Sequence, residues 1–126
     1  MTGPLAGIRV VEAGVWVAGP AAAGIMADWG ADVIKIEPPT GEPLRGMANP
    51  ARIPDVNPPF ELDNRGKRSV ALNLADPEGY RIARRLIDRA DVFITNMVPA
   101  VVERLRLTYD DLKATNPGLI YCHITG

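Results

Sequence analysis

The stretch that decides the fold is residues 8–37, which read IRVVEAGVWVAGPAAAGIMADWGADVIKIE. The opening segment, Ile8–Val11, is mostly apolar and β-branched, which predicts a short buried strand. Ala18–Trp29 is rich in alanine, carries a proline in its first turn and is followed by Gly30, which is typical of a helix. Asp32–Glu37 is again largely apolar and predicts a second strand. The stretch therefore reads strand, helix, strand.

The same alternation continues towards the carboxyl end. Ser69–Leu74 alternates apolar and polar side chains and predicts a third strand. Asp76-Pro77-Glu78 is a strong helix start, because it combines an N-cap, a first-turn proline and an acid near the positive end of the helix dipole. The remaining elements that we expect are a strand over Asp91–Thr95, a short helix over Ala100–Leu105, a helix from Thr108 that stops at Asn116, and a strand over Leu119–Thr125. Strands that alternate with helices predict an α/β fold, a parallel sheet with helices on both faces.

Glycine and proline, 12 of each, concentrate between residues 37 and 68. Proline removes backbone donors and restricts the residue before it, so a long helix or a central strand is not expected there. We expect an ordered surface loop, held by four apolar anchors, which are Met47, Ile53, Phe60 and Leu62. A floppy insertion is the alternative.

Composition restricts the class of protein. The 126 residues carry a formal charge of −1, one cysteine and one histidine, and they suit one compact domain without internal repeats. The near-neutral charge argues against nucleic acid or an anionic membrane as a partner. Cys122 alone excludes an internal disulfide and favours a reducing compartment. No apolar stretch reaches the roughly 20 residues that span a bilayer, and Met1–Leu5 lacks a signal-peptide pattern. We therefore expect a soluble cytoplasmic protein.

An open parallel sheet binds ligands beyond the carboxyl ends of its strands, so the loops that follow the strands are the candidate sites. The loop Gly14–Pro20 places glycines close to a helix N-terminus, where backbone N–H groups can receive an anion. Glu37 ends the second strand, where a dinucleotide-binding fold has its ribose-binding acid. Gly14, Gly19 and Gly24 are spaced by five, however, and do not form the G-x-G-x-x-G fingerprint. A nicotinamide-binding domain is kept as an alternative.

Basic side chains gather just before the third strand. Gly66-Lys67-Arg68-Ser69 does not complete a phosphate-binding P-loop, because residue 61 is Glu and Arg68 occupies the Ser or Thr position. Arg65, Lys67 and Arg68 have two interpretations. They form either a solvated charged turn or a local anion site of the kind that a phosphorylated cofactor needs.

The residue types give no convincing catalytic or metal constellation. His123 lies in an apolar strand and is expected to be a satisfied core or sheet-face residue. Cys122 is its neighbour, so the two side chains point to opposite faces, which disfavours a Cys–His pair. No second histidine or cysteine completes a metal site. Some acids could do acid–base work but have no plausible nucleophile beside them in sequence: Glu12, Asp28, Asp32 and Glu37.

Six segments, taken together and in order, carry a family resemblance. They are Pro4–Glu12, Ala18–Pro20, Trp29–Gly41, Asn64–Leu74, Ala90–Asn96 and Asn116–Gly126. The set resembles family III CoA-transferases, which include formyl-CoA transferase, carnitine CoA-transferase and α-methylacyl-CoA racemase. It covers nearly the whole chain and is far more specific than any single motif.

The resemblance implies a Rossmann-like domain that binds coenzyme A. Residues 1–126 would form the N-terminal part of that domain, so we expect an incomplete sheet. The whole protein would be an interlocked homodimer that takes acyl-CoA and a small carboxylic acid as substrates, with no tightly bound cofactor.

The resemblance also implies a CoA-binding set. Its members are Val17, Ala18, Gly19, Pro38, Leu72, Asn73, Leu74, Asn96, Met97, Val98 and Arg104. The first three would face the thioester end, and Pro38 would lie where some members stack a basic side chain on the adenine. The run from Leu72 would line the nucleotide, and the run from Asn96 would approach the pantetheine and pyrophosphate. Arg104 would contact a CoA phosphate, since a planar guanidinium matches phosphate oxygens.

One segment departs from the family pattern. The chain reads Asn96-Met97-Val98-Pro99-Ala100 where many members read Asn-Phe-Arg-Pro-Gly. A basic residue that would strengthen binding of a CoA phosphate is therefore missing here.

The family's catalytic residues would lie beyond this chain. In the transferases an aspartate attacks the acyl-CoA to form a mixed anhydride and then an enzyme–CoA thioester, whereas the racemases move the α-proton with a His and Asp pair. No residue here matches these positions, and His123 comes too early. We therefore expect the chain alone to be inactive and to bind CoA weakly at most. Racemase-type epimerisation of acyl-CoA and a non-catalytic or split CoA-binding subunit are the alternatives.

Overall fold

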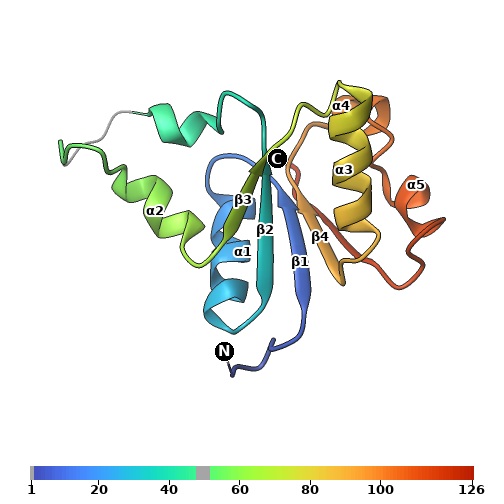
Figure 1. Ribbon diagram of the computed structural model, residues 1–126, viewed down its shortest axis with the longest axis horizontal. Coiled ribbons are helices and arrows are strands. Elements are labelled where there is room, and N and C mark those ends of the chain that lie inside the picture. The colour runs from blue at the N-terminus through green and yellow to red at the C-terminus, as the bar shows by residue number, and fades with distance from the viewer. Residues whose placement is uncertain (1, 48–51) are drawn as a thin grey trace.

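The computed structural model, which describes residues 2–47 and 52–126, has one five-stranded parallel sheet (Figure 1). The strands are β1 (Arg9–Ala13), β2 (Asp32–Glu37), β3 (Arg68–Ala71), β4 (Val92–Thr95) and β5 (Ile120–His123). The helices are α1 (Ala18–Asp28), the 3₁₀ helix η1 (Pro43–Gly46), α2 (Pro58–Asn64), α3 (Pro77–Ile87), α4 (Pro99–Arg104) and α5 (Tyr109–Lys113). Every pair of neighbouring strands is parallel.

Helices cover both faces of the sheet, which confirms the predicted fold class. Figure 1 shows α1 and α2 to one side of the strands and α3, α4 and α5 to the other. Side chains alternate along each strand, so Val10 and Val33 join the core beneath α1, whereas Val11 and Phe93 join the core beneath α3. Burial on both faces explains why the inner strands β1 and β4 are largely apolar.

The strand order β3-β2-β1-β4-β5 creates a crossover point beside the central strand. The chain first moves outward from β1 to β3 and then returns to the other side of β1 with β4. The connections leave in opposite directions from the carboxyl ends of β1 and β4. Ligands of open α/β sheets bind at such a point.

Local signals placed the starts of α3 and α5 correctly. Asp76 caps α3, where its side chain accepts hydrogen bonds from the Glu78 and Gly79 amides at 2.9 and 3.2 Å. Thr108 and Asp111 form a reciprocal capping box at the start of α5.

The surface loop expected between residues 37 and 68 includes two short helices, whereas the prediction excluded only a long one. Residues 48–51 lie outside the described residues, but η1 and α2 lie on either side of them. The helix α2 tolerates Pro58 and Pro59 because they occupy its first turn, where N–H groups have no partner inside the helix. Asn57 caps it by accepting a hydrogen bond from the Phe60 amide at 3.3 Å.

Of the four expected anchors of this segment, only Phe60 is buried. Met47, Ile53 and Leu62 are exposed, so the prediction that they anchor the segment was wrong. Phe60 packs beneath the guanidinium of Arg45, whose Cζ atom lies 3.9 Å from the centroid of the Phe60 ring.

The third strand is shorter than predicted. The Leu72 amide still donates to the Glu37 carbonyl at 2.8 Å, but Asn73 then turns the chain, with its side chain accepting from the Ala75 amide at 3.0 Å. Leu72–Leu74 therefore leaves the sheet at its carboxyl edge.

None of the described helices is long and apolar enough to cross a membrane.

Candidate functional site

A cavity of about 290 Å³ opens at the carboxyl edge of the sheet, beside the crossover point. It is lined by the ends of β1 and β2, by the turn after β3 and by the segments on either side of α4. The lining residues are Ala13, Gly14, Val15, Ile36, Glu37, Pro38, Pro39, Leu72, Asn73, Leu74, Ala75, Met97, Arg104 and Leu105. Its wall is mainly apolar side chains and backbone.

A second hollow, of about 480 Å³, continues from the first along the amino end of α3. The two share Leu74, Ala75, Arg104 and Leu105. The two hollows therefore adjoin each other, and together they are called the groove.

Arg104 stands where the two hollows join. It ends α4 and is exposed, and its side chain makes no hydrogen bond or ion pair with any residue that the structure describes. The neighbouring Arg84, by contrast, bonds to Tyr80 and Thr115. Arg104 therefore offers its full guanidinium to a ligand in the groove.

The turn that forms one wall of the cavity is held by close packing. Gly79, in the first turn of α3, lies directly against the backbone of Asn73 and leaves no space for a Cβ atom. The Asn73 side chain is used in the turn itself, so the ligand-facing wall at Asn73 is largely backbone.

Six of the residues expected to bind CoA line this cavity, namely Pro38, Leu72, Asn73, Leu74, Met97 and Arg104. Five others do not: Val17, Ala18, Gly19, Asn96 and Val98. Val17 and Val98 are exposed near the opening, and Gly19 is buried against the sheet. Asn96 bonds to both backbone groups of Val15, at 2.9 Å to the amide and 2.7 Å to the carbonyl.

Glu37 borders the cavity but is fully engaged inside the protein. Its carboxylate accepts from Arg45 at 2.7 Å through each oxygen, from Ser69 at 2.6 Å and from the Glu42 amide at 3.0 Å. Burial alone would raise the pKa of Glu37, but these hydrogen bonds outweigh it and lower the pKa to about 2. With both oxygens occupied, Glu37 has no free acceptor for a ribose.

Of the two interpretations of the basic run before β3, the solvated charged turn fits Arg65 and Arg68, which are exposed to solvent, and neither fits Lys67. Arg65 pairs with Asp28, Arg68 pairs with Asp32, and Lys67 is buried against Glu12. Burial lowers the pKa of Lys67, opposed by the nearby carboxylate. Arg65 and Arg68 are thus exposed, ion-paired cations, Lys67 is a buried one, and none of the three is a free anion site.

His123 and Cys122 form no catalytic pair. The His123 Nε2 atom lies 2.7 Å from the Met97 carbonyl oxygen, and its ring packs edge-on against Tyr121. Cys122 is exposed. Among the described residues, no three His, Cys, Asp or Glu side chains come together as a metal site.

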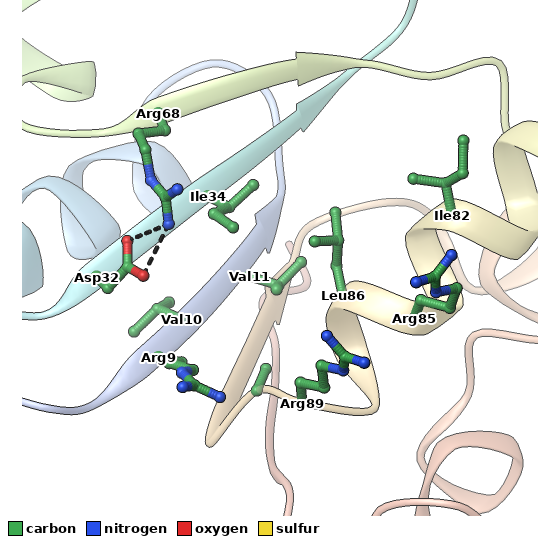
Figure 2. A pocket seen from close by; sticks show the side chains of 11 residues that line it. Arg9, Val10, Val11, Asp32, Ile34, Arg68, Ile82, Arg85, Leu86 and Arg89 are labelled. Carbon is green, nitrogen blue, oxygen red and sulfur yellow. Dashed lines mark hydrogen bonds and ion pairs between the residues drawn. The ribbon is translucent and has the colours of Figure 1, made fainter.

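A larger hollow, of about 510 Å³, lies at the opposite end of the sheet (Figure 2). The side chains of Arg9, Arg85 and Arg89 stand around it and make no hydrogen bond or ion pair in the described part of the chain, whereas Arg68 bonds to Asp32. It lies at the amino ends of β1, β2 and β3. Ligands of this architecture bind at the carboxyl ends, so the cavity beside Arg104 is the candidate site.

Sequence reasoning missed one group of buried charges beside the candidate site, formed by Glu12, Lys35, Glu42 and Lys67. The available signal was Lys35, a cation in the middle of an otherwise apolar strand.

A model of CoA-transferase family III matches residues 5–126 of the chain. The chain is 41% identical over 125 residues to (R)-2-hydroxy-4-methylpentanoate CoA-transferase of Clostridioides difficile, covering 97% of the chain and 31% of that protein. It is also 41% identical to succinate–glutarate CoA-transferase of Agrobacterium fabrum, covering 98% of the chain and 32% of that protein. The chain thus spans about one third of the length of these relatives.

Solved structures give the same similarity. A CAIB/BAIF family protein from Brucella suis superposes with a TM-score of 0.93 at 42% identity, over all of this chain and 34% of that one. A protein from Mycobacterium tuberculosis superposes with a TM-score of 0.90 at 39% identity, over 99% of this chain and 34% of that one. A putative β-ketoacyl-ACP reductase, at 18% identity, covers 93% of this chain and 54% of its own with a TM-score of 0.54, and shares the fold alone.

Proposed function

Because the chain belongs to CoA-transferase family III, we propose that it forms the CoA-binding part of an enzyme that moves CoA from an acyl-CoA to a carboxylic acid. In this proposal residues 1–126 are the N-terminal part of a Rossmann-like domain, and the whole enzyme is a cytoplasmic interlocked homodimer. Its named relatives are CoA-transferases that differ in the acids they use.

The observation that carries the proposal is the unpartnered Arg104 at the joint of the two hollows. CoA is a long molecule that is anionic at its nucleotide end and mostly neutral along its pantetheine arm. A groove with one free guanidinium and otherwise apolar and backbone walls complements that distribution of charge.

The groove residues divide naturally along such a ligand. Arg104 binds a phosphate, and the backbone of Leu72–Leu74 lines the nucleotide. Pro38 lies against the adenine, and Met97 contacts the pantetheine arm. The loop that contains Val17, Ala18 and Gly19 faces the thioester.

The transfer itself needs a carboxylate from outside this chain. An aspartate attacks the thioester carbonyl, which forms a mixed anhydride and expels the CoA thiolate. The thiolate then attacks the aspartyl carbonyl of the anhydride, releases the first carboxylic acid and leaves an enzyme–CoA thioester. The acceptor acid reverses these steps. The 126-residue chain alone is therefore inactive in acyl transfer.

Amide-resolved NMR titration of the 13.6 kDa chain tests the binding part directly. Adding CoA should shift the amides of Gly14, Val15 and Leu72–Leu74, and NAD should not. Arg104→Ala should weaken CoA binding by about tenfold, as expected when a charged hydrogen bond is lost. Arg89→Ala is the matched control, because Arg89 is also unpartnered but lies in the hollow at the other end of the sheet.

Two results would reject the proposal. One is tight NAD binding without CoA binding. The other is CoA-induced shifts confined to the hollow around Arg9, Arg85 and Arg89. If the complete enzyme epimerised an acyl-CoA in the absence of any acceptor acid, its activity would be that of a racemase and not of a transferase.

A further inference from the structure

Four buried charged side chains lie beneath the loop that connects β1 to α1. This buried charge cluster consists of Glu12, Lys35, Glu42 and Lys67, whose side chains are at most 2% exposed. Lys35 pairs with both glutamates, at 2.9 Å to Glu12, and Lys67 pairs with Glu12 at 3.0 Å. Two positive and two negative charges cancel, so the cluster is neutral as a whole.

The buried charge cluster is bonded to both ends of the loop above it. Lys35 Nζ donates to the Gly14 carbonyl at 3.0 Å, and the Gly14 amide donates to Glu12 Oε1 at 2.9 Å. Lys67 Nζ donates to the Pro20 carbonyl at 2.7 Å. The start of the loop and the first turn of α1 are therefore held from below by charged groups.

The backbone conformation of this loop indicates that its surroundings hold it in place. Trp16 has a φ of +65°, a left-handed conformation that costs a residue with a side chain about 1–2 kcal/mol and persists only when its surroundings impose it. Val15, just before it, is clamped from the other side by Asn96. Gly14 and Val15 are also wall residues of the candidate site.

Stability alone does not explain four charges in this place. Burying paired charges costs so much desolvation that well-packed apolar side chains often stabilise a protein equally or better. What apolar side chains cannot do is fix the two peptide planes that meet at Gly14: Glu12 holds the Ala13–Gly14 peptide through its N–H, and Lys35 holds the Gly14–Val15 peptide through its carbonyl.

Resting on the proposed function, we propose that Lys35 is a positioning residue for CoA binding. It holds the Gly14 peptide so that Gly14 and Val15 form a rigid wall of the CoA cavity. Lys35 does not touch the ligand, because it is buried beneath that wall.

A variant of Glu42 separates the effect of the Lys35–Gly14 hydrogen bond from the effect of the buried ion pairs. It pairs with Lys35, and its oxygens accept no hydrogen bond within the described residues. Glu42→Gln therefore removes one buried charge and leaves the Lys35–Gly14 bond in place. Lys35→Met combined with Glu42→Gln removes the same carboxylate charge and the loop bond, and leaves Glu12 and Lys67 as a neutral pair.

The test compares CoA affinity of these two variants by the NMR titration above. Glu42→Gln should bind CoA within about twofold of the unmodified chain, whereas the double variant should bind about tenfold more weakly. The Val15 amide, which shares its peptide plane with the Gly14 carbonyl, should also exchange with solvent faster in the double variant only. Lys35→Gln with Glu42→Gln keeps an uncharged donor at residue 35 and should recover part of the affinity.

Three other outcomes would each contradict either the proposed function or the positioning role of Lys35. If neither the unmodified chain nor the complete enzyme binds CoA, the proposed function fails. If the unmodified chain binds CoA and the folded double variant binds equally well, the positioning role of Lys35 is wrong. If neither double variant folds, as judged by far-UV circular dichroism, the cluster is a folding determinant and the positioning role is rejected.

Discussion

Replacing Glu37 with glutamine should destabilise the protein in a manner that depends on pH. Glu37 ends β2 and ties it to two other segments, because its carboxylate accepts from Arg45 and the Glu42 amide near η1 and from Ser69 in β3. Glutamine keeps the size of the side chain but removes its charge. It also turns one acceptor into a donor that faces the Arg45 guanidinium.

The size of the effect follows from the pKa. The pKa of Glu37 falls from 4.5 to about 2 on folding, a difference of about 2.5 that corresponds to about 3 kcal/mol. Arg45 is 45% exposed, so solvent screening reduces the expected contribution to about 2 kcal/mol. Between these two pKa values the unfolded chain binds a proton that the folded protein does not. The contribution is therefore complete above pH 4.5 and is lost as the pH falls towards 2.

Urea unfolding followed by circular dichroism, from pH 7 down to pH 2.5, measures this difference. Glu37→Gln should cost about 2 kcal/mol at pH 7, and the cost should shrink steadily below pH 4.5. Glu78→Gln is the control, because Glu78 pairs with Arg81 on the exposed face of α3, where ion pairs contribute little. An equal cost of Glu37→Gln at pH 3 and pH 7 would refute the charge-based reasoning.

Three further predictions follow from the packing and the groove. Arg104→Ala in the complete enzyme should raise the KM for acyl-CoA more than it lowers kcat in steady-state kinetics, because a remote phosphate contact gives mainly uniform binding. Phe93→Ala removes a fully buried ring from the centre of β4 and should lower the unfolding free energy in urea by about 3–5 kcal/mol. Gly79→Ala should destabilise although alanine favours helices by about 1 kcal/mol, because its Cβ would collide with the Asn73 backbone; a more stable variant in urea would contradict that packing.

Elements with local signals were predictable from the sequence. The bounds of β2 match the predicted strand Asp32–Glu37, and α3 begins directly after its predicted cap, Asp76. Both depend on neighbouring residues: a run of apolar side chains in one case, a cap and a first-turn proline in the other. Such signals need no knowledge of the rest of the fold.

The segment around α2 was less predictable because its stabilising contacts are distant in sequence. Proline content indicated a loop, but Phe60 is buried partly by Arg45, fifteen positions earlier. The Asn57 side chain also donates to the carbonyl of Leu44 at 2.7 Å, which joins the start of α2 to η1. Composition cannot show which of the apolar residues in a proline-rich segment is buried by a residue that is distant in sequence.

The candidate site was predictable as a location and only partly as a set of residues. Parallel strands bring their carboxyl ends to one edge, so the position of Leu72–Leu74 and Met97 in the cavity follows from the predicted topology. Asn96 shows what topology leaves open. Its side chain is used to clamp Val15, which depends on the conformation of a loop more than eighty positions away.

The sequence signal for the buried charge cluster lies in the register between β1 and β2 more than in any single residue. In the pairing of β1 with β2, Glu12 lies opposite Lys35, and the two side chains form a buried ion pair. A slip of one residue would move Glu12 away from Lys35 and leave a buried charge uncompensated, at a cost of about 3–5 kcal/mol. The Glu12–Lys35 ion pair therefore favours this register. That register also places Lys35 beneath Gly14, so the pairing that orders the sheet sets the wall of the candidate site.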